Sequence, residues 1–301
     1  MNPGAALKDF DPFARSPAGA LRYLVLDVFS ATPLEGNQLA VFLDGDGLGG
    51  ERMQALAREL KLSETVFMLP AEAAGDARIR IFTPTAELPF AGHPTLGSAT
   101  VLAAALGRRR VVLETGSGPV EVIFDEQRER AGHGWMAQPL PSWSEFEASA
   151  ELLGAIGVAD SALPVEVYCN GPRHVYVELA TREAVAGLEP DLGALGGLGE
   201  IGVSCFAGDG ASFKSRMFAP GLGVAEDPAT GSAAGPLAVH LARHGRIAWG
   251  QEIEIEQGAE LRRPSLLRAR AFGSGAQLER VEVGGSAVIV AAGSFWPDPA
   301  P

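Results

Sequence analysis

Three titratable residues have surroundings that could support proton transfer and anion binding: Glu64, His93 and Asp227. Glu64 lies among apolar neighbours, where desolvation raises the pKa of a carboxyl group and suits it to take up and return a proton near neutral pH. His93 lies between Gly92 and Pro94, where it could exchange a hydrogen bond with a ligand. The ordinary alternatives are a solvated carboxylate or helix cap for Glu64 and a surface histidine for His93.

Asp227 precedes Pro228 in a turn of small residues that leads into an apolar run, and this pattern predicts a loop followed by a helix. Asp227 could cap that helix, or it could orient a hydroxyl or amine of a substrate. Small residues at a helix start leave backbone N–H groups unpaired and let a ligand approach them. The N–H groups of Gly231 and Ser232, with the Ser232 hydroxyl, therefore form a candidate anion site.

Two stretches of the sequence resemble each other and would position these residues. Residues 82–106 and 218–241 each run from Phe-x-Pro through a loop to a titratable residue beside proline, and then to Gly-Ser-Ala and an apolar helix. They lie too far apart for the short period of a solenoid. The pattern predicts two related domains, each with one helix N-terminus; the alternative is two unrelated Gly-rich turns before ordinary core helices.

The remaining patterns predict a protein of mixed strands and helices. In the first half, alternating or β-branched runs predict strands at 22–29, 39–43, 65–69, 78–82, 111–114, 120–124 and 134–137, and apolar periodicity predicts helices at 51–60 and 94–106. In the second half, strands are predicted at 165–169, 174–179, 202–207, 212–218, 252–257, 278–283 and 287–292, helical or turn structure at 145–158, and helices at 182–187 and from residue 230.

A loop rich in proline and glycine at 133–144 favours a domain boundary near residue 130. We therefore expect a tail at 1–20, an N-terminal domain at 21–130 and a C-terminal domain at 131–285. The last strand, at 286–296, could return to complete the sheet of the first domain.

Composition narrows the class of protein. A chain of 301 residues is long enough for two domains with separate cores, and 47% apolar with 20% charged residues is typical of a globular rather than a disordered protein. The apolar runs are shorter than a membrane span and no secretory signal opens the chain, so we expect a cytoplasmic protein that does not bind membranes. The formal net charge of −13 argues against nucleic acid as a partner.

Other residues are weaker candidates. Glu87 lies in the same loop as His93 and is a rival base, and His174 could line a cleft at a strand start. Cys169 and Cys205 lack the spacing of a metal or redox motif, which favours free thiols. Because the sequence contains no nucleotide-binding, zinc-protease or serine-hydrolase motif, we expect no metal and no cofactor.

Taken together, the motifs resemble the PhzF-like isomerases of phenazine biosynthesis. The resemblance is carried by DVFSATPLEGNQLAVF at 27–42, SETVF around Glu64, GHPT at 92–95 and EDPATGSA at 226–233, in this order. It implies an α+β fold of the diaminopimelate epimerase type, with two pseudo-symmetric domains, each a curved mixed β-sheet around a central helix, and an active site in the interdomain cleft. The central helices would be 94–106 and 232–244.

The resemblance also implies roles for individual residues. Glu64 would be the single acid/base, which removes a proton from one carbon of a small, cyclic carboxylic acid and returns it to another. The implied substrate contacts are His93, Asp227 and Ser232 through their side chains, and Gly92 and Gly231 through their backbone. The related epimerases use two cysteines, which the loops AGHP and DPATG lack here, so a one-base proton shift is expected. The resemblance further implies a homodimer.

Two rival functions stay open at this point. A racemase or epimerase on the same fold would pair Glu64 with His93 or Asp227 as the base on the opposite face of the substrate. A protein of the same fold could instead bind a small carboxylate and catalyse nothing. A fold by itself does not set the substrate.

Overall fold

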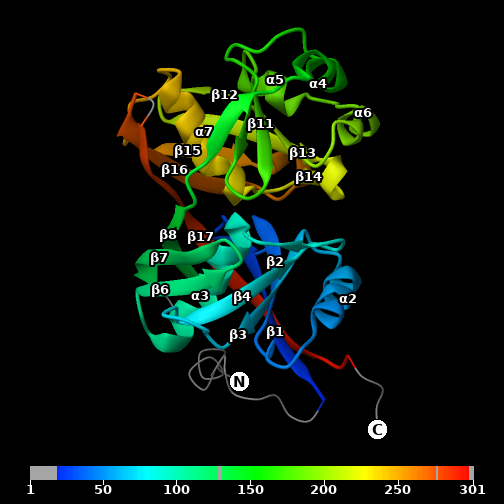
Figure 1. Ribbon diagram of the computed structural model, residues 1–301, viewed down its shortest axis with the longest axis vertical. Helices are drawn as coiled ribbons and strands as arrows, with labels where there is room; N and C mark the ends of the chain where they lie inside the picture. Colours follow the sequence, from blue (N-terminus) through cyan, green and yellow to red (C-terminus); the bar gives the residue numbers. More distant parts are fainter. Residues whose placement is uncertain (1–18, 128–130, 276, 298–301) are drawn as a thin grey trace. The chain divides into compact units, whose positions relative to one another are not determined.

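The computed structural model describes residues 19–127, 131–275 and 277–297 (Figure 1). The chain divides into two compact units: unit 1 comprises the residues up to Met136 and those from Gly285 onward, and unit 2 comprises Ala137–Gly284. The expected boundary at 130 adjoins residues outside the described ranges, and the division falls within strand β8 (Ala131–Gln138). The expected tail, 1–20, lies almost wholly outside the described residues.

Unit 1 is a mixed sheet around one helix. Its further strands are β1 (Leu21–Val28), β2 (Asn37–Phe42), β3 (Glu64–Leu69), β4 (Ala77–Phe82), β5 (Glu87–Leu88), β6 (Arg110–Thr115), β7 (Gly118–Gln127) and the C-terminal part of β17 (Gln277–Phe295), and its helices are α2 (Gly50–Leu60) and α3 (Gly92–Leu106). The C-terminal part of β17 pairs with β1 and so belongs to the sheet of unit 1.

The central position of α3 follows from its composition. The helix contacts β1, β2, β3, β4, β6 and β7 (Figure 1), and every residue from Gly92 to Ala103 is buried. A helix that is apolar on all sides must lie inside a core, whereas α2 buries only the face with Met53, Leu56 and Ala57. The sheet of unit 1 therefore fixes the start of α3 from several sides.

Unit 2 contains the other elements. They are β9 (Ser142–Glu145), α4 (Ser149–Ile156), β10 (Glu166–Cys169), β11 (Arg173–Glu178), α5 (Arg182–Ala186), α6 (Leu192–Gly197), β12 (Gly202–Asp209), β13 (Ser212–Ala219), β14 (Val224–Asp227), α7 (Gly231–Arg243), β15 (Ile253–Gln257), β16 (Ser265–Ser274), the N-terminal part of β17, and 3-10 turns at Pro220–Leu222 and Ala259–Leu261. Like α3, α7 is buried along nearly its whole length, from Gly231 to Ala242.

The two units repeat one topology. In unit 1 the pairs β1–β2, β2–β3, β3–β4, β4–β6 and β6–β7 run antiparallel, parallel, antiparallel, parallel and antiparallel. In unit 2 the pairs β10–β11, β11–β12, β12–β13, β13–β15 and β15–β16 follow the same order. The central helix precedes the fifth strand of each series. The expected fold class, two related domains each with a central helix, is confirmed.

The first turns of the two central helices correspond residue by residue in a way that differs from the match between the two sequence stretches. His93 and Pro94 lie inside the first turn of α3, whereas Asp227 and Pro228 precede α7. The second residue of α3 is His93, and the second residue of α7 is Ser232. These two residues are therefore topological counterparts, although the sequence pattern matched His93 with Asp227.

Some expected elements differ. The two strands predicted at 278–283 and 287–292 form one continuous strand, β17, and the strands β5, β9, β14 and β16 and helix α6 were not predicted. Among the described residues, no helix combines the length and the apolar character needed to cross a membrane.

Candidate functional site

Glu64 and His93 come together in unit 1. Glu64 is the first residue of β3, and His93 is the second residue of α3. The Glu64 Oε2 atom lies 3.5 Å from His93 Nε2, and the two side chains are 16% and 4% exposed. On the other side of the ring, Nδ2 of Asn37, the first residue of β2, lies 3.3 Å from His93 Nδ1. The two strand starts thus fix the imidazole between a carboxyl group and an amide.

The imidazole of His93 is neutral at physiological pH. Burial lowers the pKa of His93 from its ordinary 6.5 to about 3, although a backbone hydrogen bond with Gln38 acts in the opposite direction. A neutral ring provides a hydrogen-bonding partner without placing a positive charge beside Glu64.

The start of α3 also presents main-chain donors. The first N–H groups of a helix have no acceptor inside the helix. Within the described ranges, the N–H groups of Gly92 and His93 have no hydrogen-bond acceptor, and Pro94 has no N–H. The first donor that is satisfied is that of Thr95, which bonds to Ala91 O at 3.3 Å.

In unit 2, Asp227 is held next to the start of α7. Thr230 is the N-cap of this helix, so Asp227 does not have the capping role that sequence reasoning considered for it. Thr230 Oγ1 donates to Asp227 Oδ2 at 2.7 Å. Gln257 Nε2 donates to the main-chain oxygen of Asp227 at 2.8 Å and to Thr230 Oγ1 at 3.0 Å. Thr230 thus contacts the carboxylate of Asp227, and Gln257 holds both the main chain of Asp227 and the Thr230 hydroxyl.

Side chains from other elements hold the first turn of α7. They donate to three successive carbonyl groups: Gln138 Nε2 to Gly231 O at 2.8 Å, Asn170 Nδ2 to Ser232 O at 2.9 Å, and Tyr176 Oη to Ala233 O at 2.7 Å. The second bond replaces a helical one, because Pro236, four residues after Ser232, has no N–H. The N–H groups of Gly231 and Ser232, like those at the start of α3, have no acceptor in the part of the chain that the structure describes.

His174 contacts Ser232 directly. It is the second residue of β11, and its Nε2 lies 3.0 Å from Ser232 Oγ. Burial lowers the pKa of His174 to about 4, so this ring too is neutral at physiological pH. Sequence reasoning placed His174 at a strand start that could line a cleft, but gave it no partner.

Glu166, His240 and His244 are the described residues whose side chains could together hold a metal ion, because their ligand atoms lie within 4.8 Å of one another. However, Glu166 Oε2 already accepts from Arg243 Nη1 at 2.7 Å and from Tyr168 Oη at 2.9 Å. Burial alone would raise the pKa of Glu166, but hydrogen bonds from His240, Arg243, His244 and Tyr168 lower it well below its usual range. A cation would have to displace the Arg243 guanidinium, so we assign this cluster a structural role.

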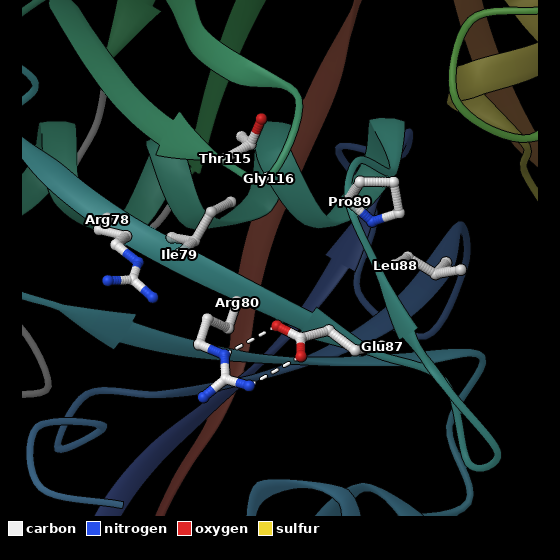
Figure 2. A pocket seen from close by; sticks show the side chains of 8 residues that line it. All are labelled: Arg78, Ile79, Arg80, Glu87, Leu88, Pro89, Thr115 and Gly116. Atoms are coloured by element: carbon white, nitrogen blue, oxygen red, sulfur yellow. Dashed lines mark hydrogen bonds and ion pairs between the residues drawn. The ribbon is translucent and has the colours of Figure 1, made fainter. Parts of the chain in front are cut away.

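Glu87, the rival base, lies on the surface. Arg80 holds its carboxylate in a two-pronged ion pair, Nε to Oε1 and Nη2 to Oε2, both at 2.7 Å (Figure 2). The Glu87 side chain is 43% exposed. The surface groove of about 530 Å³ at this ion pair is not lined by Glu64 or His93. A solvated carboxylate neutralised by arginine is a poor base, so the geometry favours Glu64 over Glu87.

The two cysteines are free, as expected, with Cys169 exposed and Cys205 buried. Burial raises the pKa of the Cys205 thiol to about 12, so this thiol is not a nucleophile. Sequence reasoning missed the amide side chains Asn37, Gln138, Asn170 and Gln257, which hold the site residues. One signal was present: Gln257 ends an alternating strand at a position of the buried phase, where an amide needs partners.

Comparison with known proteins gives consistent matches over most of the chain. A family model for phenazine biosynthesis-like proteins matches residues 26–293. The trans-2,3-dihydro-3-hydroxyanthranilate isomerase of Pseudomonas aeruginosa is 52% identical over 275 residues, which cover 91% of this chain and 99% of that protein. A solved structure from Pseudomonas aeruginosa, described as a predicted epimerase, is 34% identical with a TM-score of 0.79 and covers 91% of this chain and 99% of its own.

A hydroxyproline epimerase from Agrobacterium vitis, solved with bound trans-4-hydroxy-L-proline, is 13% identical and has a TM-score of 0.61. The match covers 94% of this chain and 92% of that chain. At this identity the likeness concerns the fold alone. It agrees with the epimerase-like architecture of two related units.

Proposed function

The chain belongs to the phenazine biosynthesis-like family and is an isomerase, and from this premise we propose that it shifts a proton within a small, cyclic carboxylic acid, with Glu64 as the single acid/base. The observation that carries the proposal is the position of Glu64. Its side chain is only 16% exposed and lies 3.5 Å from His93, which is neutral. A shielded carboxyl group beside a neutral ring can take up a proton and give it back.

The substrate class follows from the donors at the helix starts. A proton on a carbon conjugated to a carboxylate is only weakly acidic, so the negative charge that develops when it leaves must be stabilised. We propose that the carboxylate binds the N–H groups of Gly231 and Ser232 and that Asp227 orients a hydroxyl or amine of the substrate. His93 and the N–H of Gly92 bind the substrate beside Glu64.

Trans-2,3-dihydro-3-hydroxyanthranilate, the substrate in the name of the relative from Pseudomonas aeruginosa, fits this description. It is a cyclic acid with an amine on the ring carbon next to the carboxylate-bearing carbon and a hydroxyl on the carbon after that. We propose it as the first compound to test. Glu64 would remove a proton from one ring carbon, hold it, and deliver the same proton to another carbon, so that no oxidant, reductant or second base is needed.

We further propose that the reaction uses no metal and no cofactor. Main-chain N–H groups at two helix starts supply positive partial charge without an ion. The homodimer that the resemblance implies and the cytoplasmic location expected from the sequence stay predictions.

The test is the rate at which this substrate is converted to its isomer in D₂O, with the deuterium content of the product recorded, and wild-type protein is compared with Glu64→Gln. Glutamine keeps the shape of the side chain but cannot take up the proton, so we expect the rate to fall by about 10²- to 10⁴-fold, the range for a positioned general base. Glu87→Gln is the matched control and should leave the rate unchanged. An unchanged rate in Glu64→Gln would remove this residue from the mechanism.

One observation favours a second candidate, an epimerase: the relative described as a predicted epimerase is 34% identical. An epimerase would invert one carbon and would place deuterium at that same carbon. The proposed isomerase would move a double bond, and a fraction of its product molecules would carry the original proton at a new carbon. The structure of the product in H₂O and D₂O separates the two reactions, and binding without turnover would favour a non-catalytic carboxylate-binding protein.

A further inference from the structure

His174 is buried against Ser232, and we propose that it is a positioning residue that makes the Ser232 hydroxyl a hydrogen-bond donor toward the substrate carboxylate. The inference rests on the proposed function, in which the start of α7 binds that carboxylate. It adds a residue that specifies which chemical group is accepted there. No role for His174 followed from the sequence patterns that identified the other site residues.

The ring of His174 is fixed on both edges. Nε2 lies 3.0 Å from Ser232 Oγ, and the residue is 2% exposed. Nδ1 has no hydrogen-bond partner among the described residues. This edge faces Gly202, the register partner of His174 in β12. A Cβ built on Gly202 would lie 2.8 Å from Nδ1, so any larger residue there would crowd the ring. Because this register partner is a glycine, it offers no side chain that could bond to Nδ1.

These contacts decide which nitrogen carries the proton. The ring is neutral, so it has one N–H group and one bare nitrogen. A proton on Nδ1 would be a buried donor without an acceptor, which folded proteins rarely contain. A proton on Nε2 instead donates to Ser232 Oγ. The favoured tautomer is therefore Nε2–H, with Ser232 Oγ as the acceptor.

Ser232 therefore has hydrogen-bond donors that can bind a ligand. Its hydroxyl hydrogen has no acceptor in the part of the chain that the structure describes, because the contact to His174 uses an oxygen lone pair. Its main-chain carbonyl is occupied by Asn170. Its main-chain N–H lies in the unsatisfied first turn of α7. A carboxylate, which only accepts, matches these donors, whereas the NH₂ of a carboxamide does not.

The other unit contains an analogous contact. His93, the topological counterpart of Ser232, is contacted by Asn37, which starts β2, and β2 is the counterpart of β11. In each unit, a polar side chain from the second strand of the series thus reaches the second residue of the central helix. This recurrence favours a positioning role for His174 over incidental packing.

The tautomer can be measured on the wild-type protein. The sequence contains five histidines, so the ring ¹⁵N signals of His174 can be assigned by comparison with a His174→Gln variant. We expect the Nε2–H tautomer at pH 7, with a shift of the Nε2 signal in Ser232→Ala. An Nδ1–H tautomer would overturn the proposal. This result does not depend on turnover.

The functional consequence is tested with two substitutions of similar size. The amide nitrogen of glutamine can take the place of Nε2 and donate to Ser232 Oγ. The side chain of asparagine is too short for its amide nitrogen to reach Ser232 Oγ. We expect His174→Asn to raise KM by about 10-fold with a smaller change in kcat, because a ground-state contact to the carboxylate is lost, and His174→Gln to stay within about threefold of wild type. Equal losses in both variants would indicate a purely structural role.

A double-mutant cycle with Ser232→Ala completes the test. If His174 acts through the serine hydroxyl, His174→Asn should change kcat/KM by less than about twofold in the Ser232→Ala background. The wild-type preference for a carboxylate over a carboxamide inhibitor should also fall in His174→Asn. Additive losses in the cycle would overturn the proposal. If wild type shows no turnover, or Ser232→Ala keeps full activity, the proposed function fails instead, and the ¹⁵N measurement still decides the state of His174.

Discussion

At the residue scale, Glu166 shows how a buried charge is stabilised in this fold. Its carboxylate accepts from Arg243, Tyr168, His240 and His244, and the side chain is only 9% exposed. Since both histidines and the arginine lie at the C-terminal end of α7, these bonds join the end of the central helix to β10. Favourable positive charge at a helix C-terminus supports the same arrangement.

Glu166→Gln should therefore be destabilising. The substitution leaves Arg243 without its charge partner, and because Arg243 is 18% exposed we expect a loss of about 2–3 kcal/mol, below the ~3–5 kcal/mol of a fully buried pair. Glu256→Gln is the control, since Glu256 pairs with Arg182 on the surface and is 56% exposed. It should cost less than about 1 kcal/mol in urea unfolding. Equal losses in the two variants would show that the Glu166 cluster is not structural.

The site residues and their supports differ in how far the sequence predicts them. Glu64 and His93 could be singled out because their types are chemically unusual beside apolar or small neighbours, and the structure brings them within 3.5 Å of each other. Their supporting amides could not, because Asn37 and Asn170 are ordinary polar residues whose partners lie 56 and 62 positions away. Such contacts are set by strand pairing, which local patterns do not specify.

At the element scale, β17 shows why a glycine pair can be misread. The two strands predicted at 278–283 and 287–292 leave out Gly284, Gly285 and Ser286, but β17 continues through these residues. A Cβ on Gly285 would lie 2.3 Å from Cδ1 of Phe29, a fully buried ring. Glycine is needed there so that the aromatic ring can approach the strand, and not because the chain turns.

Replacing glycine with alanine should have opposite effects on stability at two positions of the chain. Gly285→Ala should destabilise the protein by about 1–3 kcal/mol, because Phe29 or the strand must move to accommodate the methyl group. Gly154→Ala in α4 meets no atom within 4 Å, and it should stabilise by about 0.5–1 kcal/mol because alanine favours the helix. Thermal unfolding of both variants tests the pair. A stabilising Gly285→Ala would show that β17 does not need this glycine.

β16 was missed for a different reason. Its inward residues include the small Ala269 and Ala271, while Arg268 and Arg270 alternate with them and are only partly buried. Arg268 pairs with Glu254 and Arg270 with Glu282, on the neighbouring strands. Arginine alternating with alanine reads as a polar segment, because the apolar signal of a methyl group is weak. Only the neighbouring strands reveal it as part of the sheet.

At the scale of the whole molecule, the internal repeat was predictable but its alignment was not. The repeated letters indicated two related domains, and the identical order of strand pairing in the two units agrees with them. Residue identity nevertheless matched His93 with Asp227, whereas helix position matches His93 with Ser232. The position in the central helix, and not the residue type, therefore gives the correspondence between the two units.

Each unit also contains a buried neutral histidine, which predicts how stability depends on pH. The folded-state pKa of His93 is about 3 and that of His174 about 4, both lowered by burial from 6.5. Below pH 6.5 the unfolded chain therefore binds protons that the folded chain does not, so stability is highest above this pH and falls as the pH is lowered toward 4 for His174 and toward 3 for His93. Between pH 8 and pH 5 each histidine should remove about 2 kcal/mol from the free energy of unfolding.

Urea unfolding at a series of pH values measures this effect. His93→Gln and His174→Gln should each reduce the loss of unfolding free energy between pH 8 and pH 5, because glutamine does not titrate. Burial also lowers the pKa of His240, so a residual slope should remain in the double variant. If neither single variant changes the slope, the two rings are not held neutral by burial, and the uncharged environment that the mechanism assigns to Glu64 would have to be given up.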